Sequence, residues 1–255
     1  MNSEFRFHAR TLQYGNFLRS FLVLIFSFVT VAAVYSLPFV IEMLVSFGGT
    51  AEFTVKLILA VIIALVSYFL IFSLSYGIKR YFLKCADGER KALSNLLYFL
   101  KPSKVIDTAR FSLCSGIANA AFAVICLTPS AMVLFGTLKM LENNASLKVT
   151  SIAVCCFAAM LVIGLYFYFR VKRMLFLCGY LFAAEKSNSF LECVKISSKK
   201  MEKQTSWLFL TRFSFIGWIA ACIFVLPIAY VWTYYNQTMA VAAKSIIEGE
   251  AEILQ

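Results

Sequence analysis

Long apolar stretches, separated by shorter polar segments, dominate this chain of 255 residues. Several of them exceed the roughly 18 apolar residues that mark a membrane-spanning helix. They predict an all-α fold, a polytopic bundle of transmembrane helices that forms a single integral membrane domain over residues 1–255. We expect five spans, at residues 18–46, 55–78, 110–138, 149–169 and 207–235.

The first, third and fifth of these spans are longer than a bilayer requires. About 29 helical residues extend about 43 Å, against an apolar slab of about 30 Å, so these helices must tilt, bend or extend beyond it. Each contains a proline in its outer half, and the candidate helix kinks are Pro38, Pro129 and Pro227. Three kinks at similar depth would form an outward-facing vestibule; the alternative is that proline is simply common in membrane helices.

Two polar segments, residues 79–109 and 170–206, predict amphipathic helices at the cytoplasmic interface. Asp87–Gly88 predicts a turn, and Pro102 ends the helix that follows it. The apolar residues of the first segment recur at helical spacing among lysines, at Leu93, Leu96, Leu97 and Leu100. The second segment repeats this arrangement with Phe190, Leu191, Val194 and Met201. Such helices lie on the inner leaflet with their apolar side in the lipid.

Composition and charge support a membrane protein. The chain is 61% hydrophobic, and its formal net charge is +11. Nineteen of the 24 Lys and Arg residues lie in the N-terminal tail through Arg19, in residues 79–110 and in residues 170–206. This asymmetry places the N-terminus and both segments in the cytoplasm, with the chain in the cell membrane. It also accounts for the basic charge, so we expect no nucleic-acid partner.

The side on which the C-terminus lies depends on the number of spans. With five spans, Lys244 and the acidic tail lie outside. With six, Pro227 and the pair Asn236–Gln237 turn the chain back, and residues 228–247 form a weak sixth element.

Three arginines stand near the inner ends of the odd spans. They are candidate lipid anchors: Arg19, Arg110 and Arg212. Arginine suits this role because its planar fork binds a phosphate through two hydrogen bonds. In the alternative, Arg212 faces the bundle and holds a substrate or a buried partner.

Residues with catalytic potential are sparse. His8 is the one histidine, so a histidine-based metal site or triad cannot form. The eight cysteines include no C-x-x-C pair and are interpreted as packing residues. Asn119 is the one amide within a predicted span, and we expect it to bond a neighbouring helix. We therefore predict no catalytic, cofactor-binding or metal-ligating residues, no cofactor and no enzymatic activity.

A group of motifs resembles a known family. Its core is Ser214, Phe215, Ile216, Gly217 and Trp218. Ser197–Met201 and Trp207–Phe209 precede this core. Weaker matches lie upstream, at Ala9–Leu12, Gly15–Asn16, Tyr76–Gly77, Arg80–Leu83 and Asp87–Glu89. Together they resemble the bacterial membrane family listed as domain of unknown function 975, over most of the chain.

Two departures from that family are visible. Pro227 is followed by Ile228, so the family's Pro-Tyr pair is not intact, and the usual glycine near Gln204 is replaced. The resemblance implies a bacterial cytoplasmic-membrane protein and supplies no catalytic residues.

These observations favour a non-enzymatic scaffold or accessory subunit of a membrane complex. The expected partners are anionic lipid headgroups and a second membrane protein or another copy of the chain. The alternative is a small-molecule or peptide transporter, which the kinked spans favour. The lack of a carboxylate or histidine at mid-membrane disfavours it.

Overall fold

The computed structural model describes residues 2–44, 50–89, 92–143, 146–202, 204–217 and 226–249. These residues form helices and contain no strand, which confirms the predicted all-α fold. The elements are α1 (Asn2–Leu44), α2 (Thr50–Ala86), α3 (Ala92–Leu96), the 3-10 helix η1 (Tyr98–Leu100), α4 (Pro102–Glu142), α5 (Leu147–Met174), α6 (Cys178–Ala183), α7 (Phe190–Met201), α8 (Thr205–Phe213) and α10 (Leu226–Glu248).

Four helical segments among the described residues are long and apolar enough to cross a membrane. They are Phe7–Leu37, Thr54–Ala86, Pro102–Glu142 and Lys148–Ala183. The chain is therefore a membrane protein. Within the predicted fifth span, 207–235, α8 ends at Phe213, a turn follows at Ser214 and Phe215, and α10 begins at Leu226. Residues 218–225 lie outside the described residues.

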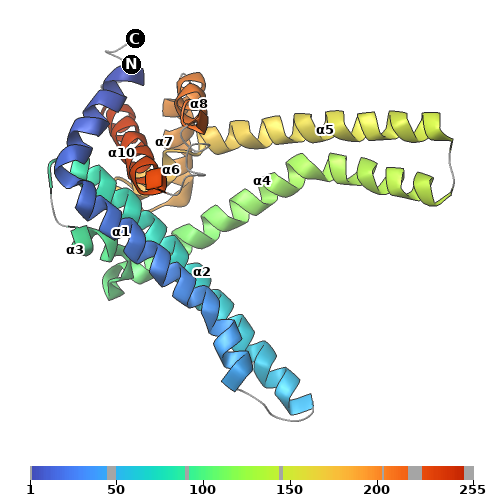
Figure 1. The fold of residues 1–255 in the computed structure, drawn as a ribbon, viewed down its shortest axis with the longest axis horizontal. Coiled ribbons are helices and arrows are strands. Elements are labelled where there is room, and N and C mark those ends of the chain that lie inside the picture. Colours follow the sequence, from blue (N-terminus) through green and yellow to red (C-terminus); the bar gives the residue numbers. More distant parts are fainter. Residues whose placement is uncertain are drawn as a thin grey trace.

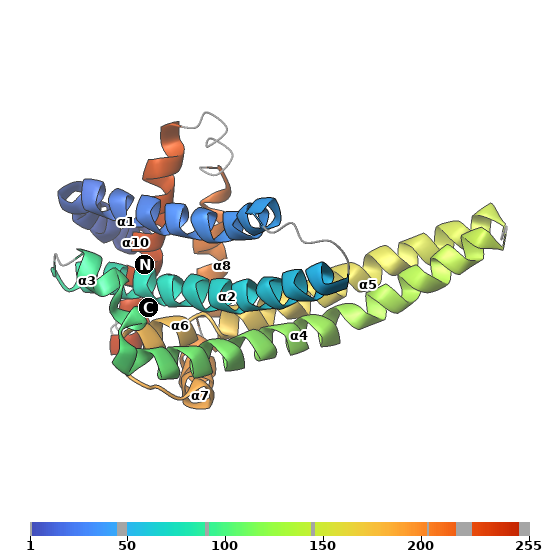
Figure 2. The ribbon, with the colours of Figure 1, turned by 90° about the horizontal axis from the view of Figure 1, so that it is seen from below.

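The long helices form two hairpins that diverge from a common base (Figure 1). Helices α1 and α2 pack against each other in the first hairpin, and α4 and α5 in the second. The short helices gather at the base, and the second hairpin projects far beyond them (Figure 2). Only 11% of the residues in the most apolar stretch of α4 are buried. In the most apolar stretch of the fourth span, Lys148–Ala183, the buried share is 6%. Most of the hairpin surface is thus open to lipid.

The second hairpin is closely packed and bent. A side chain at Gly164 of α5 would overlap the backbone carbonyl of Cys126 in α4, so glycine allows the two backbones to meet. Helix α4 contains Pro129 and changes direction along its length (Figure 1). The hydroxyls of Thr128 and Ser130 donate to backbone carbonyls in the preceding turn, at 2.5 and 2.7 Å. Such side-chain bonds accompany proline kinks in membrane helices.

The buried core lies at the base of the hairpins. Its centre is an aromatic cluster formed by Tyr76 of α2, Phe99 of η1, Phe111 of α4 and Phe182 of α6. The Phe111 and Phe182 rings stack with their centroids 4.2 Å apart, and Tyr76 meets Phe182 edge-on at 5.1 Å. All residues of α6 are buried. Aromatic contacts therefore hold both hairpins to the same centre.

The first amphipathic segment packs differently from the expectation. Helix α3 is only five residues long, and Leu96 and Phe99 are buried in the protein core instead of facing outward. The close approach of α3 to α2 requires Gly77, because a side chain there would overlap the carbonyl of Leu96. In α7, Met201 is likewise buried, whereas Leu191 is 78% exposed. The apolar side of these segments thus mainly covers the bases of the hairpins.

Two helices at the base end in the same hydrogen-bonded motif. After α2, Gly88 adopts a positive φ of 82°, and its N–H donates to the Cys85 carbonyl. This confirms the predicted turn at Asp87–Gly88. After α6, Glu185 takes the same position with a φ of 57°, and its N–H donates to the Phe182 carbonyl. Glycine usually occupies this position because a side chain strains it.

Helix α10 returns to the base of the hairpins. Its Lys244 Nζ lies 2.7 Å from the Asp87 carboxylate, and Lys200 Nζ donates to the carbonyls of Ile246 and Ile247. The five-span arrangement places Lys244 on the side opposite to Asp87, and this contact does not favour it; the number of spans stays a prediction. The end of α10 lies beside Asp87, as the six-element alternative requires, although Asn236–Gln237 lies inside α10 and forms no turn.

Candidate functional site

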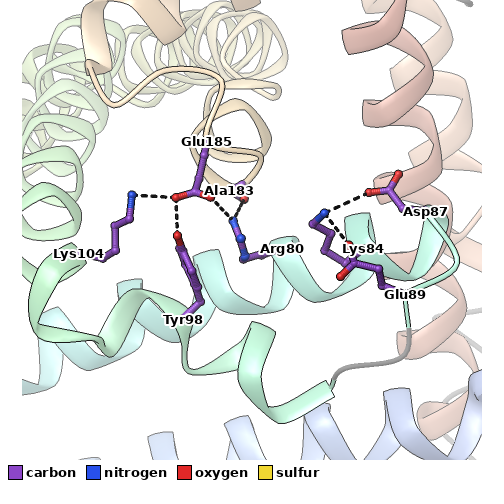
Figure 3. Close-up of polar contacts among 8 residues, drawn as sticks. All are labelled: Arg80, Lys84, Asp87, Glu89, Tyr98, Lys104, Ala183 and Glu185. Carbon is purple, nitrogen blue, oxygen red and sulfur yellow. Dashed lines mark hydrogen bonds and ion pairs between the residues drawn. The ribbon is translucent and has the colours of Figure 1, made fainter.

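A network of charged residues joins four elements at the base (Figure 3). Glu185 accepts hydrogen bonds from Lys104 Nζ at 2.8 Å and from the Tyr98 hydroxyl at 2.6 Å. Arg80 Nη1 donates to the other carboxylate oxygen and to the Ala183 carbonyl, both at 3.1 Å. The Arg80 guanidinium also lies 3.7 Å from the centre of the Tyr98 ring. One carboxylate thus connects α2, η1, α4 and the residues after α6.

The protonation states of this network are stable near neutral pH. Partial desolvation raises the pKa of Glu185, but the hydrogen bonds from Lys104 and Tyr98 and the charge of Arg80 outweigh it, so this pKa falls to about 2. The hydrogen bond to Glu185, together with desolvation, raises the pKa of Tyr98. Neither group exchanges a proton at neutral pH, so the role of the network is to hold these elements together.

A cavity of about 440 Å³ lies between α2, α4, α5, α8 and α10. Three cationic side chains from three different helices line it: Lys79 of α2, Lys172 of α5 and Arg212 of α8. None of the described residues that line the cavity is acidic. Ser115 and Asn119 of α4 contribute a hydroxyl and an amide to the same wall. We call this space the basic cavity.

The cations of the basic cavity rest on aromatic rings. Lys79 Nζ lies 5.2 Å from the ring centre of Tyr76 and 5.8 Å from that of Tyr180. The Arg212 guanidinium lies 5.3 Å from the Phe176 ring centre. Its Nε is buried and has no hydrogen-bond partner among the described residues. Ring faces attract cations but accept few N–H bonds, so the aromatic contacts leave most of the N–H groups of these side chains without an acceptor.

The backbone of α6 comes close to Lys79. A side chain at Gly179 would overlap the Lys79 ammonium group, so the Lys79 side chain lies directly against the backbone of α6. Lys172, in contrast, is exposed and stands at the mouth. The cavity therefore has a partly buried interior, formed by Lys79 and Arg212, and an accessible rim.

The structure does not bring the three candidate anchoring arginines together. Arg212 lines the basic cavity, and both interpretations of this residue, lipid anchor or ligand-holding residue, stay predictions. Arg19 of α1 and Arg110 of α4 are exposed. Lipid anchoring by Arg19 and Arg110 stays a prediction.

The candidate kinks have different positions in their helices. Pro129 lies inside α4, and Pro38 lies within the bounds of α1. Pro227 is the second residue of α10. The outward vestibule that these three residues suggested stays a prediction.

The family motif lies directly after α8. Phe215 is buried, and its ring centre is 5.4 Å from that of Tyr234 and 5.3 Å from that of Tyr235. Ser214 donates to the Thr211 carbonyl, whereas Ile216 is exposed. The Gly217 position has open space around it, and Trp218 lies outside the described residues. The described part of the motif therefore packs α8 against α10.

Sequence reasoning missed Lys79 and Lys172 as members of a site. Both were counted only as signals of membrane orientation. A weak signal existed, because Tyr76 and Lys79 follow each other at helical spacing near the end of a span. Asn119, expected to bond a neighbouring helix, lies on the cavity wall.

The described residues contain no group of three or more His, Cys, Asp or Glu side chains that could hold a metal ion. Comparisons of the chain with protein-family models, with curated proteins and with solved structures found no match.

Proposed function

We propose that the protein is a non-enzymatic scaffold or accessory subunit of a membrane complex. The observation that supports this most is the projecting α4–α5 hairpin, most of whose surface packs on no other described part of the chain. Ser151, Cys155 and Ala159 are exposed on α5 at intervals of four residues, so they share one side of the helix. Small side chains favour close association between helices in lipid.

The test is photo-crosslinking in native membranes. A photoreactive residue at position 155 or 159 should produce a crosslinked product of defined mass. That mass distinguishes a second copy of the chain from a different subunit. Met160 is also exposed but points to another side of α5, so position 160 is the control. The proposal fails if positions 155 and 159 yield no such product, or if position 160 yields the same one.

Several further assignments accompany this proposal. We assign the chain to the bacterial cytoplasmic membrane, with a cytoplasmic N-terminus and with Arg19 and Arg110 at anionic headgroups. We also assign it no nucleic-acid partner. The motif at residues 214–218 supports membership of the family listed as domain of unknown function 975.

The basic cavity favours a second candidate, a transporter of an anionic small molecule or peptide. Uptake of labelled solutes into vesicles containing the purified protein tests it. Uptake that exceeds that of protein-free vesicles and is abolished by Lys79→Gln would support transport. Equal uptake in both kinds of vesicle would exclude transport of those solutes.

A further inference from the structure

Lys79, Lys172 and Arg212 bring three positive charges to one cavity whose described lining contains no carboxylate. Like charges held together repel each other, more strongly at partly buried sites than in water. Aromatic rings offset this repulsion only in part. A bound anion removes it, and we propose that the basic cavity binds a phosphate group. This inference goes beyond the scaffold role and does not depend on it.

Phosphate fits the cavity better than a carboxylate does. A phosphate monoester carries a charge of about −1.5 to −2 near neutral pH and offers three acceptor oxygens. The fork of Arg212 can bind two of these oxygens, while the lysines act as point charges. Ser115 and Asn119 can donate further hydrogen bonds from α4. A carboxylate brings one charge and would leave more of the positive charge uncompensated.

The volume of the cavity indicates a ligand larger than inorganic phosphate. Small-molecule sites typically enclose about 300–1,000 Å³, and this cavity holds about 440 Å³. Phe72, Phe111 and Phe190 provide apolar wall for the rest of the molecule. Two sources share this chemistry: the headgroup of an anionic lipid and a soluble organic phosphate. The cavity lies near the basic end of the spans, where both can reach it.

The experiment measures ligand-dependent thermal stabilisation of the purified protein in phosphate-free detergent. A ligand that binds only the folded state raises the unfolding midpoint, and the rise grows with the logarithm of the ligand concentration once this exceeds the Kd. The probes are inorganic phosphate, glycerol phosphate and short-chain phosphatidic acid, with potassium chloride at matched ionic strength as the blank. Short-chain phosphatidylcholine tests whether a headgroup with no net charge suffices.

We expect stabilisation that increases with concentration for at least one anionic phosphate probe. Lys79→Gln and Arg212→Gln should each weaken binding about ten-fold or more, because each removes a charge-assisted hydrogen bond. Lys172→Gln removes the charge at the exposed mouth of the cavity. Because Lys172 is exposed, this substitution should leave the folding of the protein intact. Lys195→Gln removes one charge from an exposed position on α7 and should leave binding unchanged.

Each outcome decides something. Binding of phosphatidic acid without glycerol phosphate identifies a lipid headgroup, and binding of glycerol phosphate identifies a soluble ligand. The proposal is overturned if no phosphate probe stabilises the protein beyond the chloride blank. Equal weakening by Lys195→Gln and by the cavity variants would also overturn it, because that result indicates non-specific attraction.

Discussion

Glu185 combines a strained backbone with ion pairs to both Arg80 and Lys104. Its φ of 57° lies in the left-handed region, which costs a residue with a side chain roughly 1–2 kcal/mol. The conformation directs the carboxylate at Arg80, Tyr98 and Lys104, whose contacts offset this cost. A glycine would relax the backbone but leave three polar partners without their acceptor.

Replacement of Glu185 by Gln should lower the free energy of unfolding by about 1–2 kcal/mol, since charge-assisted hydrogen bonds are lost at a partly exposed site. The folded-state pKa of about 2 lies below the unfolded value of about 4.3. The stabilisation is therefore complete above pH 5 and is lost as the pH falls towards 2. Denaturation of both proteins between pH 7 and 3 should show their difference shrinking on acidification.

Glu142→Gln is the matched control, because Glu142 is exposed at the end of α4. It should leave stability almost unchanged. A Glu185→Gln protein as stable as the original at pH 7 would show that the network contributes nothing.

At the scale of the helices, packing and bending depend on single positions. Gly164 allows α4 and α5 to touch, and Pro129 lies within the helix that bends beside α5. Helix α4 has 41 residues and a contour length of about 62 Å, roughly twice the apolar thickness of a bilayer. Its bend and tilt therefore decide how the hairpin sits in the membrane.

The variant Gly164→Ala should destabilise the hairpin by about 1–3 kcal/mol, because the new methyl group overlaps a rigid backbone carbonyl. Titration with a denaturing detergent measures the effect. Gly136→Ala in α4 is the control, since nothing lies within 4 Å of its added methyl group. That control should be neutral or stabilising, as alanine favours helix over glycine. Equal stability of both variants would contradict the close packing.

Replacement of Pro129 by Ala should straighten α4, because the restored N–H can bond the carbonyl one turn earlier. Spin labels at the exposed positions 113 and 138 report the end-to-end distance by pulsed electron resonance. The distance should increase while the protein stays folded. An unchanged distance distribution would mean that packing against α5, and not the proline, bends this helix.

At the scale of the whole molecule, the contact of α10 with Asp87 predicts where the C-terminal end of the chain lies. The Lys244–Asp87 ion pair requires both residues to lie on the same side of the membrane, so we expect an even number of crossings between them. Topology reporters fused at Gly88 and after Gln255 should therefore report the same side of the membrane. Opposite sides would contradict the packing of α10. A reporter after Glu142, beyond one further span, is the control and should report the other side.

The sequence by itself determined the membrane class, the helical fold and the first four spans. These follow from length and hydropathy, which act locally: an apolar run of sufficient length must satisfy its backbone hydrogen bonds within its own helix. The turn at Asp87–Gly88 was also predictable, because glycine tolerates the positive φ it requires.

The tertiary structure alone decided where α10 ends, which apolar residues face protein, and which cations share a cavity. Lys79, Lys172 and Arg212 are far apart in the chain. The hydropathy pattern predicts how deep each residue lies in the membrane, but not which of them are neighbours. Likewise, the helical spacing of the leucines around Leu96 predicted that they share one side of a helix. It did not predict whether lipid or α2 covers that side. Apolar surface is buried equally well by either, so the choice depended on the close approach at Gly77 and on the aromatic contacts at the base.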